Sequence, residues 1–229
     1  MKYEFILIDL DQTIFDFKQA EKMALGKTIR AFGLEPTEEV IRRYEQINRG
    51  LWARLEQGTV THQQVLEDRF GDLFAAFGLE VDKAACSKAY GDGLSERHYY
   101  LPGAEEALEQ LRGKCRLYIA SNGTASVQRR RMDSADLYRF FDDIFISQEI
   151  GIEKPAAAFF EGAFARIPGF DRSRTMIVGD SLTSDMRGGN NAGIATCWVN
   201  PDGKACPGDI RVDYEIKSLA ELPALLENL

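Results

Sequence analysis

FILIDLDQTIF, residues 5–15, is the stretch of this sequence that decides the fold. Four apolar residues lead directly into Asp9, and Asp11 and Thr13 follow at alternate positions. A continuous apolar run that ends in polar residues is typical of a parallel strand buried on both faces. Ligands of open α/β sheets bind beyond the carboxyl ends of such strands. Two carboxylates so close together repel each other unless a cation or a shared proton intervenes. We therefore expect Asp9 and Asp11 to hold a divalent metal, and one of them to react covalently.

The composition is that of an ordinary globular protein, and its charge bears on the choice of partners. The chain has 229 residues, 45% of them hydrophobic and 28% charged, which suits one large domain or a core domain with an insertion. The formal net charge of -8 argues against nucleic acid and anionic membranes as partners. No apolar stretch approaches the roughly 18–20 residues of a membrane span, and the N-terminus lacks the layout of a secretory signal. The four cysteines form no CxxC pair, so we expect reduced thiols and a cytoplasmic protein. The oligomeric state cannot be inferred.

A helical insertion follows the first strand. Segments beginning near residues 18, 37, 61 and 82 carry apolar residues at spacings of three and four, and the first three stop at a glycine. Short connections containing Gly or Pro favour a small antiparallel four-helix bundle. We therefore predict that residues 15–101 form an inserted helical domain.

From residue 101 onward, helical and strand patterns alternate. Apolar runs at 115–123, 143–147, 175–185 and 196–200 predict strands, and helical patterns separate them. Strands alternating with helices indicate βαβ units. Residues 1–14 and 102–229 should therefore form a Rossmann-like α/β core, a mostly parallel sheet with helices on both faces.

Polar clusters stand at the ends of several predicted strands, which should lie along one edge of the sheet. The four clusters are Asp9/Asp11/Thr13, Ser121/Asn122/Gly123, Lys154/Pro155, and Gly179/Asp180/Ser181 with Asp185. Together, in this order, they resemble the four motifs of the haloacid dehalogenase (HAD) superfamily. The helical insertion after the first motif is similar to the superfamily's type 1 cap.

We expect the carboxylates of the first and fourth motifs to have different roles. Asp9 would be the nucleophile that forms an aspartyl-phosphate, and Asp11 the general acid that later acts as base. The resemblance implies that Mg²⁺ binds Asp9, Asp180 and the main-chain carbonyl of Asp11, while Asp185 holds a metal-bound water. An acid at the position of Asp11 points to phosphoryl transfer, because the dehalogenase branch lacks it. The family's usual glycine between Asp11 and Thr13 is Gln12 here.

The remaining motif residues suit a phosphate. Ser121, Asn122 and Gly123 offer a short hydroxyl and closely spaced backbone N–H groups, so we expect them to bind phosphate oxygens. Lys154 would neutralise both the nucleophile and the phosphoryl group.

Two further stretches resemble a narrower group, the bacterial house-cleaning pyrimidine 5′-nucleotidases: DLDQTIFDF at 9–17 and INRGLWARLEQGTVT at 47–61. On that basis Asn48, Arg49 and Trp52 of the insertion, and Phe15 after the nucleophile, are the candidates for substrate specificity. Trp52 and Asn48 share a helix face. The alternative is that Trp52 belongs to the core of the helical bundle.

The sequence therefore predicts a Mg²⁺-dependent phosphomonoesterase for nucleoside 5′-monophosphates, in particular the pyrimidine ones. The alternatives are hydrolysis of another small ester, such as a sugar phosphate or phosphoglycolate, and a phosphoglucomutase-like transfer. A signalling receiver domain places similar residues at strand ends, and a non-catalytic metal-binding protein is the remaining reading.

Overall fold

The computed structural model describes the whole chain, residues 1–229, which divides into two compact units. The core unit comprises residues 1–17 and 98–229, and the inserted unit comprises residues 18–97. The predicted insertion, 15–101, begins three residues earlier and ends four residues later than the inserted unit (15 against 18, 101 against 97).

A six-stranded sheet in the order β3-β2-β1-β4-β5-β6 forms the centre of the core unit, and each neighbouring pair is parallel. This confirms the predicted Rossmann-like α/β fold. Strand β6 was not predicted, because it has only three residues and just one of them is buried. The strands are β1 (Phe5–Ile8), β2 (Arg116–Ser121), β3 (Asp143–Ile146), β4 (Thr175–Gly179), β5 (Ala195–Val199) and β6 (Tyr214–Ile216).

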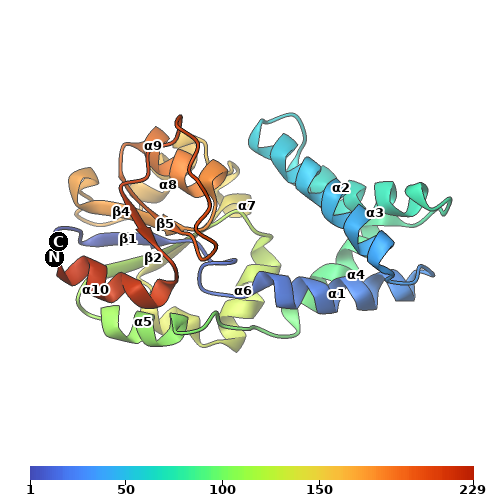
Figure 1. The fold of residues 1–229 in the computed structure, drawn as a ribbon, viewed down its shortest axis with the longest axis horizontal. Coiled ribbons are helices and arrows are strands. Elements are labelled where there is room, and N and C mark those ends of the chain that lie inside the picture. Colours follow the sequence, from blue (N-terminus) through green and yellow to red (C-terminus); the bar gives the residue numbers. More distant parts are fainter. The chain divides into compact units, whose positions relative to one another are not determined.

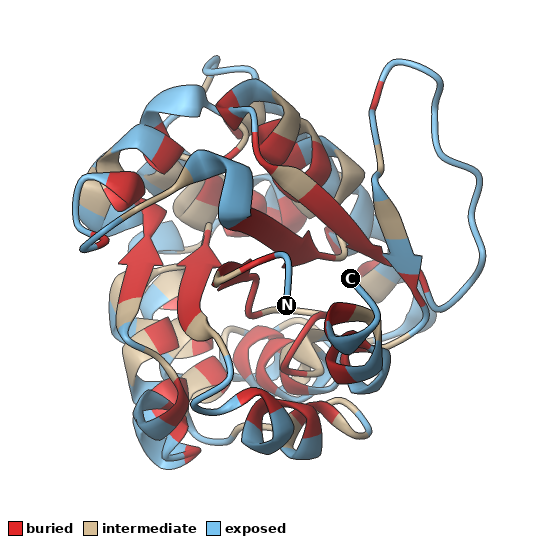
Figure 2. Ribbon diagram, turned by 90° about the vertical axis from the view of Figure 1, so that its left-hand side faces the viewer, coloured by how far each residue is buried: buried red, intermediate tan, exposed pale blue.

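Helices cover both faces of this sheet (Figure 1). Along β1, Ile6 and Ile8 pack in one apolar cluster with residues of α5 and α10, while Phe5 and Leu7 pack in another with residues of α8 and α9. This alternation follows from the two-residue period of a strand, and burial on both sides explains why the run is continuously apolar. Figure 2 shows these central strands as buried. The helices of the core unit are α5 (Ala104–Leu111), α6 (Ala125–Ser134), α7 (Ser147–Ile150), α8 (Ala157–Phe164), α9 (Arg187–Ala192) and α10 (Leu222–Glu227).

The inserted unit consists of four helices, and three of them begin at a side-chain cap, Thr37, Thr61 or Asp82. The Thr37 side chain accepts a hydrogen bond from the Val40 N–H, and Thr61 and Gln64 form a reciprocal capping box. Each cap satisfies backbone N–H groups that have no partner within the helix. The helices are α1 (Phe17–Ala31, which begins in the core unit), α2 (Glu38–Glu56), α3 (His62–Ala76) and α4 (Lys83–Ser95).

Aromatic side chains fill the interior of the inserted unit. The rings of Tyr44, Phe70 and Tyr90 contact one another with centroids 5.4–6.2 Å apart, joining α2, α3 and α4. The Tyr90 hydroxyl donates to Glu21 at 3.2 Å and thereby connects α4 to α1. The insertion therefore has its own core.

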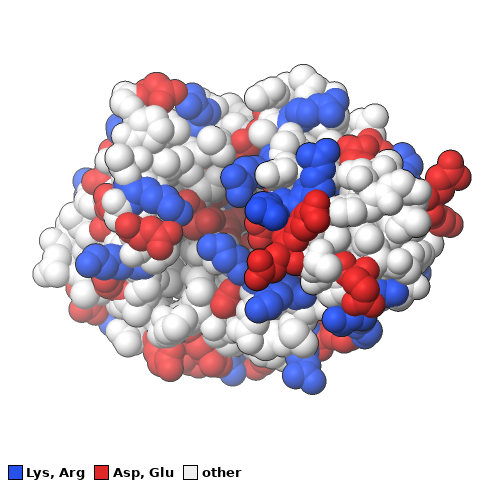
Figure 3. Space-filling view, turned by 45° about the vertical axis from the view of Figure 1, so that its right-hand side comes forward, with Lys and Arg blue, Asp and Glu red and all other residues white.

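Charged side chains of both signs are interspersed on the face drawn in Figure 3. Surface ion pairs of the core unit include Arg129 with Glu149 at 2.7 Å and Arg166 with Asp143 at 2.7 Å. Such mixing differs from the single-sign basic stripe of proteins that bind nucleic-acid backbones. None of the helices combines the length and the apolar character needed to cross a membrane.

Candidate active site

Three neighbouring strands bring their polar ends together at one edge of the sheet. Asp9 follows β1, Ser121 ends β2, and Asp180 follows β4. Because β1 lies between β2 and β4, these three residues come from adjacent strands. The strand order reverses between β1 and β4, and such a reversal opens the crevice in which α/β proteins bind ligands. The predicted convergence of motifs distant in sequence is therefore present in the fold.

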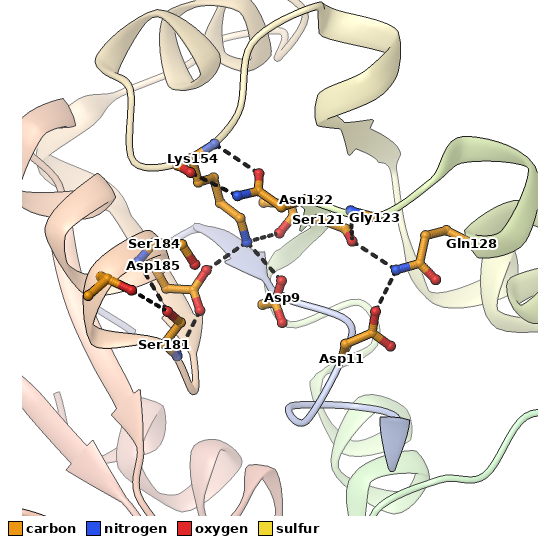
Figure 4. Close-up of polar contacts among 12 residues, drawn as sticks. Asp9, Asp11, Ser121, Asn122, Gly123, Gln128, Lys154, Ser181, Ser184 and Asp185 are labelled. Atoms are coloured by element: carbon orange, nitrogen blue, oxygen red, sulfur yellow. Dashed lines mark hydrogen bonds and ion pairs between the residues drawn. The ribbon is translucent and has the colours of Figure 1, made fainter. Parts of the chain in front are cut away.

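Lys154 lies at the centre of this edge. Its side chain is 1% exposed, and its Nζ donates to Asp9 Oδ1 at 2.8 Å, to Asp185 Oδ1 at 2.6 Å and to the carbonyl of Ala120 (Figure 4). These are the three bonds that an ammonium group can donate. Burial by itself would lower the pKa of Lys154, but the Asp185 and Asp9 carboxylates outweigh it and raise the pKa above its usual value. The ammonium is therefore a fixed positive charge beside Asp9.

Asp9, Asp180 and Asp185 form an acidic cluster in which one oxygen of each lies within 4.8 Å of the others. Burial raises the pKa of Asp9 well above its usual value; Lys154 opposes this shift, and Asp185 and Asp180 add to it. Burial and then the charge of Asp185 raise the pKa of Asp180 to about 7. Three carboxylates thus face a single ammonium, which leaves an excess of negative charge.

This cluster fits a magnesium ion. Mg²⁺ prefers oxygen ligands and takes few of them from protein, because it keeps several waters. The carboxylates of Asp9, which is buried, and Asp180, which is half-buried, supply such oxygens, and a divalent cation would compensate the excess charge. Asp185 would lie beside the ion rather than bind it directly, because both of its oxygens already accept hydrogen bonds within the protein. These come from Lys154 and from the Ser181 N–H.

Asp185 is placed by a local irregularity in the chain. It lies in a single π-helical turn, Leu182–Met186, between β4 and α9. Its Oδ2 accepts from the Ser181 N–H at 3.1 Å, and a Cβ atom built on Gly179 would lie 2.2 Å from this same oxygen. Only glycine at 179 therefore lets Asp185 reach Lys154.

The SNG turn after β2 holds parts of the site in place. The Asn122 amide makes two reciprocal hydrogen bonds with the backbone of Lys154, both at 2.8 Å, so its side chain fixes the loop that carries the lysine. Ser121 Oγ accepts from the Gly123 N–H at 3.2 Å and from Gln128 Nε2 at 3.1 Å. The Lys154–Pro155 peptide bond in the facing loop is cis. Phosphate binding by Ser121, Asn122 and Gly123 stays a proposal, in which the Asn122 amide is already paired with the Lys154 backbone.

Gln12 adopts the conformation that a glycine would adopt. Its φ is 62°, in the left-handed region, and its N–H donates to the Phe15 carbonyl at 2.7 Å. The turn after Asp9 therefore has a left-handed residue at position 12, although that residue is not glycine. The unfavourable backbone conformation costs roughly 1–2 kcal/mol.

Asp11 is held by two side chains that the sequence analysis missed. Its Oδ1 accepts from Arg131 Nη1 at 2.5 Å and its Oδ2 from Gln128 Nε2 at 2.6 Å. Both partners lie on α6, three residues apart and thus on one helix face. The motif Q-x-x-R, which four residues separate from the SNG turn, was the available signal, but polar helix residues usually face solvent.

Comparison with known proteins identifies the family. Residues 3–193 match the family model described as haloacid dehalogenase-like hydrolase. The chain belongs to the haloacid dehalogenase-like hydrolases. This confirms the resemblance seen in the four motifs and sets aside the receiver-domain reading.

Several relatives of this haloacid dehalogenase-like hydrolase cover almost the whole chain. The HAD-hydrolase YfnB of Bacillus subtilis is 39% identical over 98% of this chain and 96% of its own length. A solved structure of YfnB bound to magnesium superposes with a TM-score of 0.93, at 38% identity and 99% coverage of both chains. The pyrimidine 5′-nucleotidase PynA of Streptococcus pneumoniae is 35% identical, over 97% of this chain and 94% of PynA. The pyrimidine 5′-nucleotidase YjjG of Escherichia coli is 33% identical, over 99% of both chains.

The four predicted specificity residues of this haloacid dehalogenase-like hydrolase differ in exposure. Phe15 is completely buried in the core unit, against Tyr100 and the Arg131 guanidinium, which argues against direct substrate contact. In the inserted unit, Arg49 is exposed and Asn48 and Trp52 are half-buried. Trp52 Nε1 donates to Asn48 Oδ1 at 3.1 Å.

Trp52 has one side in the bundle and one side accessible. It packs at the edge of an apolar cluster formed by Leu51, Leu55 and Val65, and its ring contacts His62 edge to face at 5.8 Å. This matches the bundle-core alternative in part. The half-exposed remainder of Trp52, with Asn48 and Arg49, stays a proposal for substrate contact.

Proposed function

We propose that this chain is a Mg²⁺-dependent phosphomonoesterase that hydrolyses nucleoside 5′-monophosphates, in particular pyrimidine ones, through an aspartyl-phosphate. The observation that carries the proposal is the placement of Asp9. It directly follows the central strand β1, is 8% exposed, contacts the Lys154 ammonium, and adjoins the Asp180 and Asp185 carboxylates. A carboxylate so placed is a nucleophile beside the charges that a phosphoryl group requires.

In the first half of the reaction, an oxygen of Asp9 attacks phosphorus. The bond from phosphorus to the ester oxygen breaks, and Asp11 gives its proton to the leaving alcohol oxygen. Lys154 Nζ compensates negative charge on Asp9 and on the phosphoryl group. The product is an acyl-phosphate on Asp9.

In the second half, water attacks the same phosphorus and the bond to Asp9 breaks. The proton of that water passes to Asp11, which returns to its starting state, and Asp9 is released as a carboxylate. Separate partners support the separate roles, because Lys154 contacts Asp9 while Arg131 and Gln128 contact Asp11.

Asp9 and Asp180 would hold the magnesium ion, together with the main-chain carbonyl of Asp11, and Asp185 would orient a water on it. When bound, Mg²⁺ neutralises and aligns the phosphoryl oxygens. The acidic cluster and the magnesium-bound structure of the relative YfnB support this assignment.

The choice of substrate rests on the relatives. PynA and YjjG, which match almost the whole chain, are both named pyrimidine 5′-nucleotidases. Asn48, Arg49 and Trp52 of the inserted unit supply hydrogen-bonding, charged and aromatic groups of the kind that recognise a nucleoside. We propose them as the specificity residues.

A phosphate-release screen tests the proposal. Purified protein is given UMP, dUMP, CMP, dTMP, AMP, GMP, glucose 6-phosphate, β-glucose 1-phosphate and phosphoglycolate, each with Mg²⁺ and with EDTA. We expect the highest kcat/KM on a pyrimidine nucleotide and no release with EDTA. A higher kcat/KM on a sugar phosphate or phosphoglycolate would overturn the substrate assignment. Isomerisation of β-glucose 1-phosphate without phosphate release from any ester would overturn hydrolysis itself.

Replacing Trp52 with alanine tests the specificity residues. The variant should lose about tenfold in kcat/KM on UMP while remaining within about threefold on p-nitrophenyl phosphate, because stacking on a base is worth about 1–3 kcal/mol. Trp52→Phe keeps an aromatic face and is the matched control. If the alanine variant loses both activities equally and melts at a lower temperature, Trp52 serves only the bundle core.

A further inference from the structure

Two buried polar side chains on α6 converge on Asp11. Gln128 is 2% exposed and Arg131 is 0% exposed, although both residue types usually lie at the surface. Each donates a hydrogen bond to a different oxygen of the Asp11 carboxylate, at 2.6 and 2.5 Å. Contacts to both oxygens fix the rotation of the carboxylate plane as well as its position.

The two side chains also fix each other. Arg131 Nη1 donates to Gln128 Oε1 at 2.9 Å, which orients the amide so that its Nε2 faces Asp11 and Ser121 Oγ. Figure 4 shows the Gln128 amide pointing toward both acceptors. A Cβ atom on Gly123 would lie 2.2 Å from the same Nε2, so the turn after β2 leaves room for this arrangement. Asp11, Gln128 and Arg131 thus form a closed ring of hydrogen bonds.

The surroundings of Arg131 are unfavourable for a purely structural role. Its Nε and Nη2 are buried without a hydrogen-bond partner. The guanidinium lies 5.0 Å from the Phe15 ring centroid and 5.8 Å from that of Phe17, contacts that compensate only part of the desolvation. An apolar side chain of similar size would fill this space without burying a charge. The feature that requires a cation here is the Asp11 carboxylate.

We propose that Arg131 and Gln128 are positioning residues that hold Asp11 in place for both proton transfers. The inference rests on the proposed function, because it assigns to Asp11 the proton given to the leaving alcohol and the proton accepted from water. In the water step, oxygen bonds to phosphorus, the bond to Asp9 breaks, and the water proton goes to Asp11. A carboxylate that rotates freely would less often be oriented to accept that proton.

Two substrates with different leaving groups distinguish a positioning role of Arg131 and Gln128 from a role in folding alone. The alcohol of UMP needs a proton to depart, whereas nitrophenolate departs without one, so kcat/KM on p-nitrophenyl phosphate does not depend on Asp11 as an acid. Breakdown of the aspartyl-phosphate needs Asp11 as a base with either substrate. Displacement of Asp11 therefore lowers kcat on both substrates and kcat/KM on UMP only.

The experiment compares Arg131→Met and Gln128→Met with Arg130→Met, an exposed arginine on the same helix. For the first two, we expect kcat/KM on UMP to fall about 10- to 100-fold, and on p-nitrophenyl phosphate to stay within about threefold. A burst of nitrophenolate should precede a slower steady state, and acid quenching should show phosphorylated protein by intact mass. Asp11→Asn should give the same pattern more strongly. Arg131→Lys, which can still donate to Asp11, should lie between wild type and Arg131→Met.

Two results would overturn the proposal. One is a parallel fall of kcat and kcat/KM on p-nitrophenyl phosphate without a burst, as expected when only the folded fraction decreases. The other is activity on UMP within twofold of Arg130→Met. If Arg131→Met does not fold, Gln128→Met carries the same test. Failure of the proposed function is seen separately in wild type, which would then release phosphate from neither ester, or from p-nitrophenyl phosphate but not from UMP.

Discussion

Replacing Gln12 with glycine and with alanine measures the free energy stored in the turn after the nucleophile. Gln12 has a φ of 62°, a conformation that costs a residue with a Cβ atom roughly 1–2 kcal/mol. Glycine avoids this cost, but its freer unfolded state reduces the gain by about 0.4–1 kcal/mol. The glycine variant should therefore exceed the alanine variant in free energy of unfolding by about 0.5–1 kcal/mol.

The alanine variant is the control, because it removes the contacts of the Gln12 side chain and keeps the Cβ atom. Urea unfolding gives the difference in free energy directly, and the melting temperature should differ by about 1–4 °C for a chain of this length. Activity on p-nitrophenyl phosphate should stay within about twofold of wild type in both variants, because the backbone turn is unchanged. A glycine variant no more stable than the alanine variant would show that the turn is unstrained. A tenfold loss of kcat in both would show that the Gln12 side chain takes part in the chemistry.

Three further predictions concern the acidic cluster. Asp9→Asn should reduce phosphate release to the background rate, because it removes the proposed nucleophile. It should not lower the melting temperature, because the carboxylate that it removes is buried and has a raised pKa. Activity within tenfold of wild type would refute the assignment of Asp9 as the nucleophile. The raised pKa of Asp180, about 7 against roughly 3.9 in the unfolded chain, means that metal-free protein loses stability as pH rises from about 4 through 7. Mg²⁺ should therefore raise the melting temperature, measured against EDTA, more at pH 8 than at pH 5, and an equal rise would contradict this. Gly179→Ala, whose Cβ would lie 2.2 Å from Asp185 Oδ2, should raise the Mg²⁺ concentration for half-maximal activity at least about tenfold. Gly26→Ala, with open space around the new Cβ, is its control.

The sheet and the residues at its strand ends could be predicted because one physical rule covers them. Apolar runs buried on both faces are readable in the sequence, and parallel strands place their carboxyl ends together. Asp9, Lys154 and Asp180 were found in this way, as was their convergence. The second inserted helix was predicted to begin near residue 37, and it begins at Glu38, after the Thr37 cap.

What escaped prediction depends on tertiary contacts. Arg131 and Gln128 lie on a helix rich in polar residues, and only the fold shows that one face of it is turned toward Asp11. The two hydrogen bonds between the Asn122 amide and the Lys154 backbone join residues 32 positions apart, so no local sequence pattern predicts them. Glutamine rarely adopts a left-handed φ, so the residue type of Gln12 did not predict this conformation. The hydrogen bonds of the surrounding turn impose it.

The saturated ammonium of Lys154 has a consequence for product release. All three of its N–H bonds are already given to Asp9, Asp185 and Ala120. In the proposed reaction, a phosphate would gain a hydrogen bond from Lys154 only by displacing one of these acceptors, so binding would be an exchange rather than a net gain. The reverse exchange would accompany the departure of inorganic phosphate, because the same acceptors would again bind the lysine. Such competition from within the protein would weaken the binding of free phosphate and favour its release.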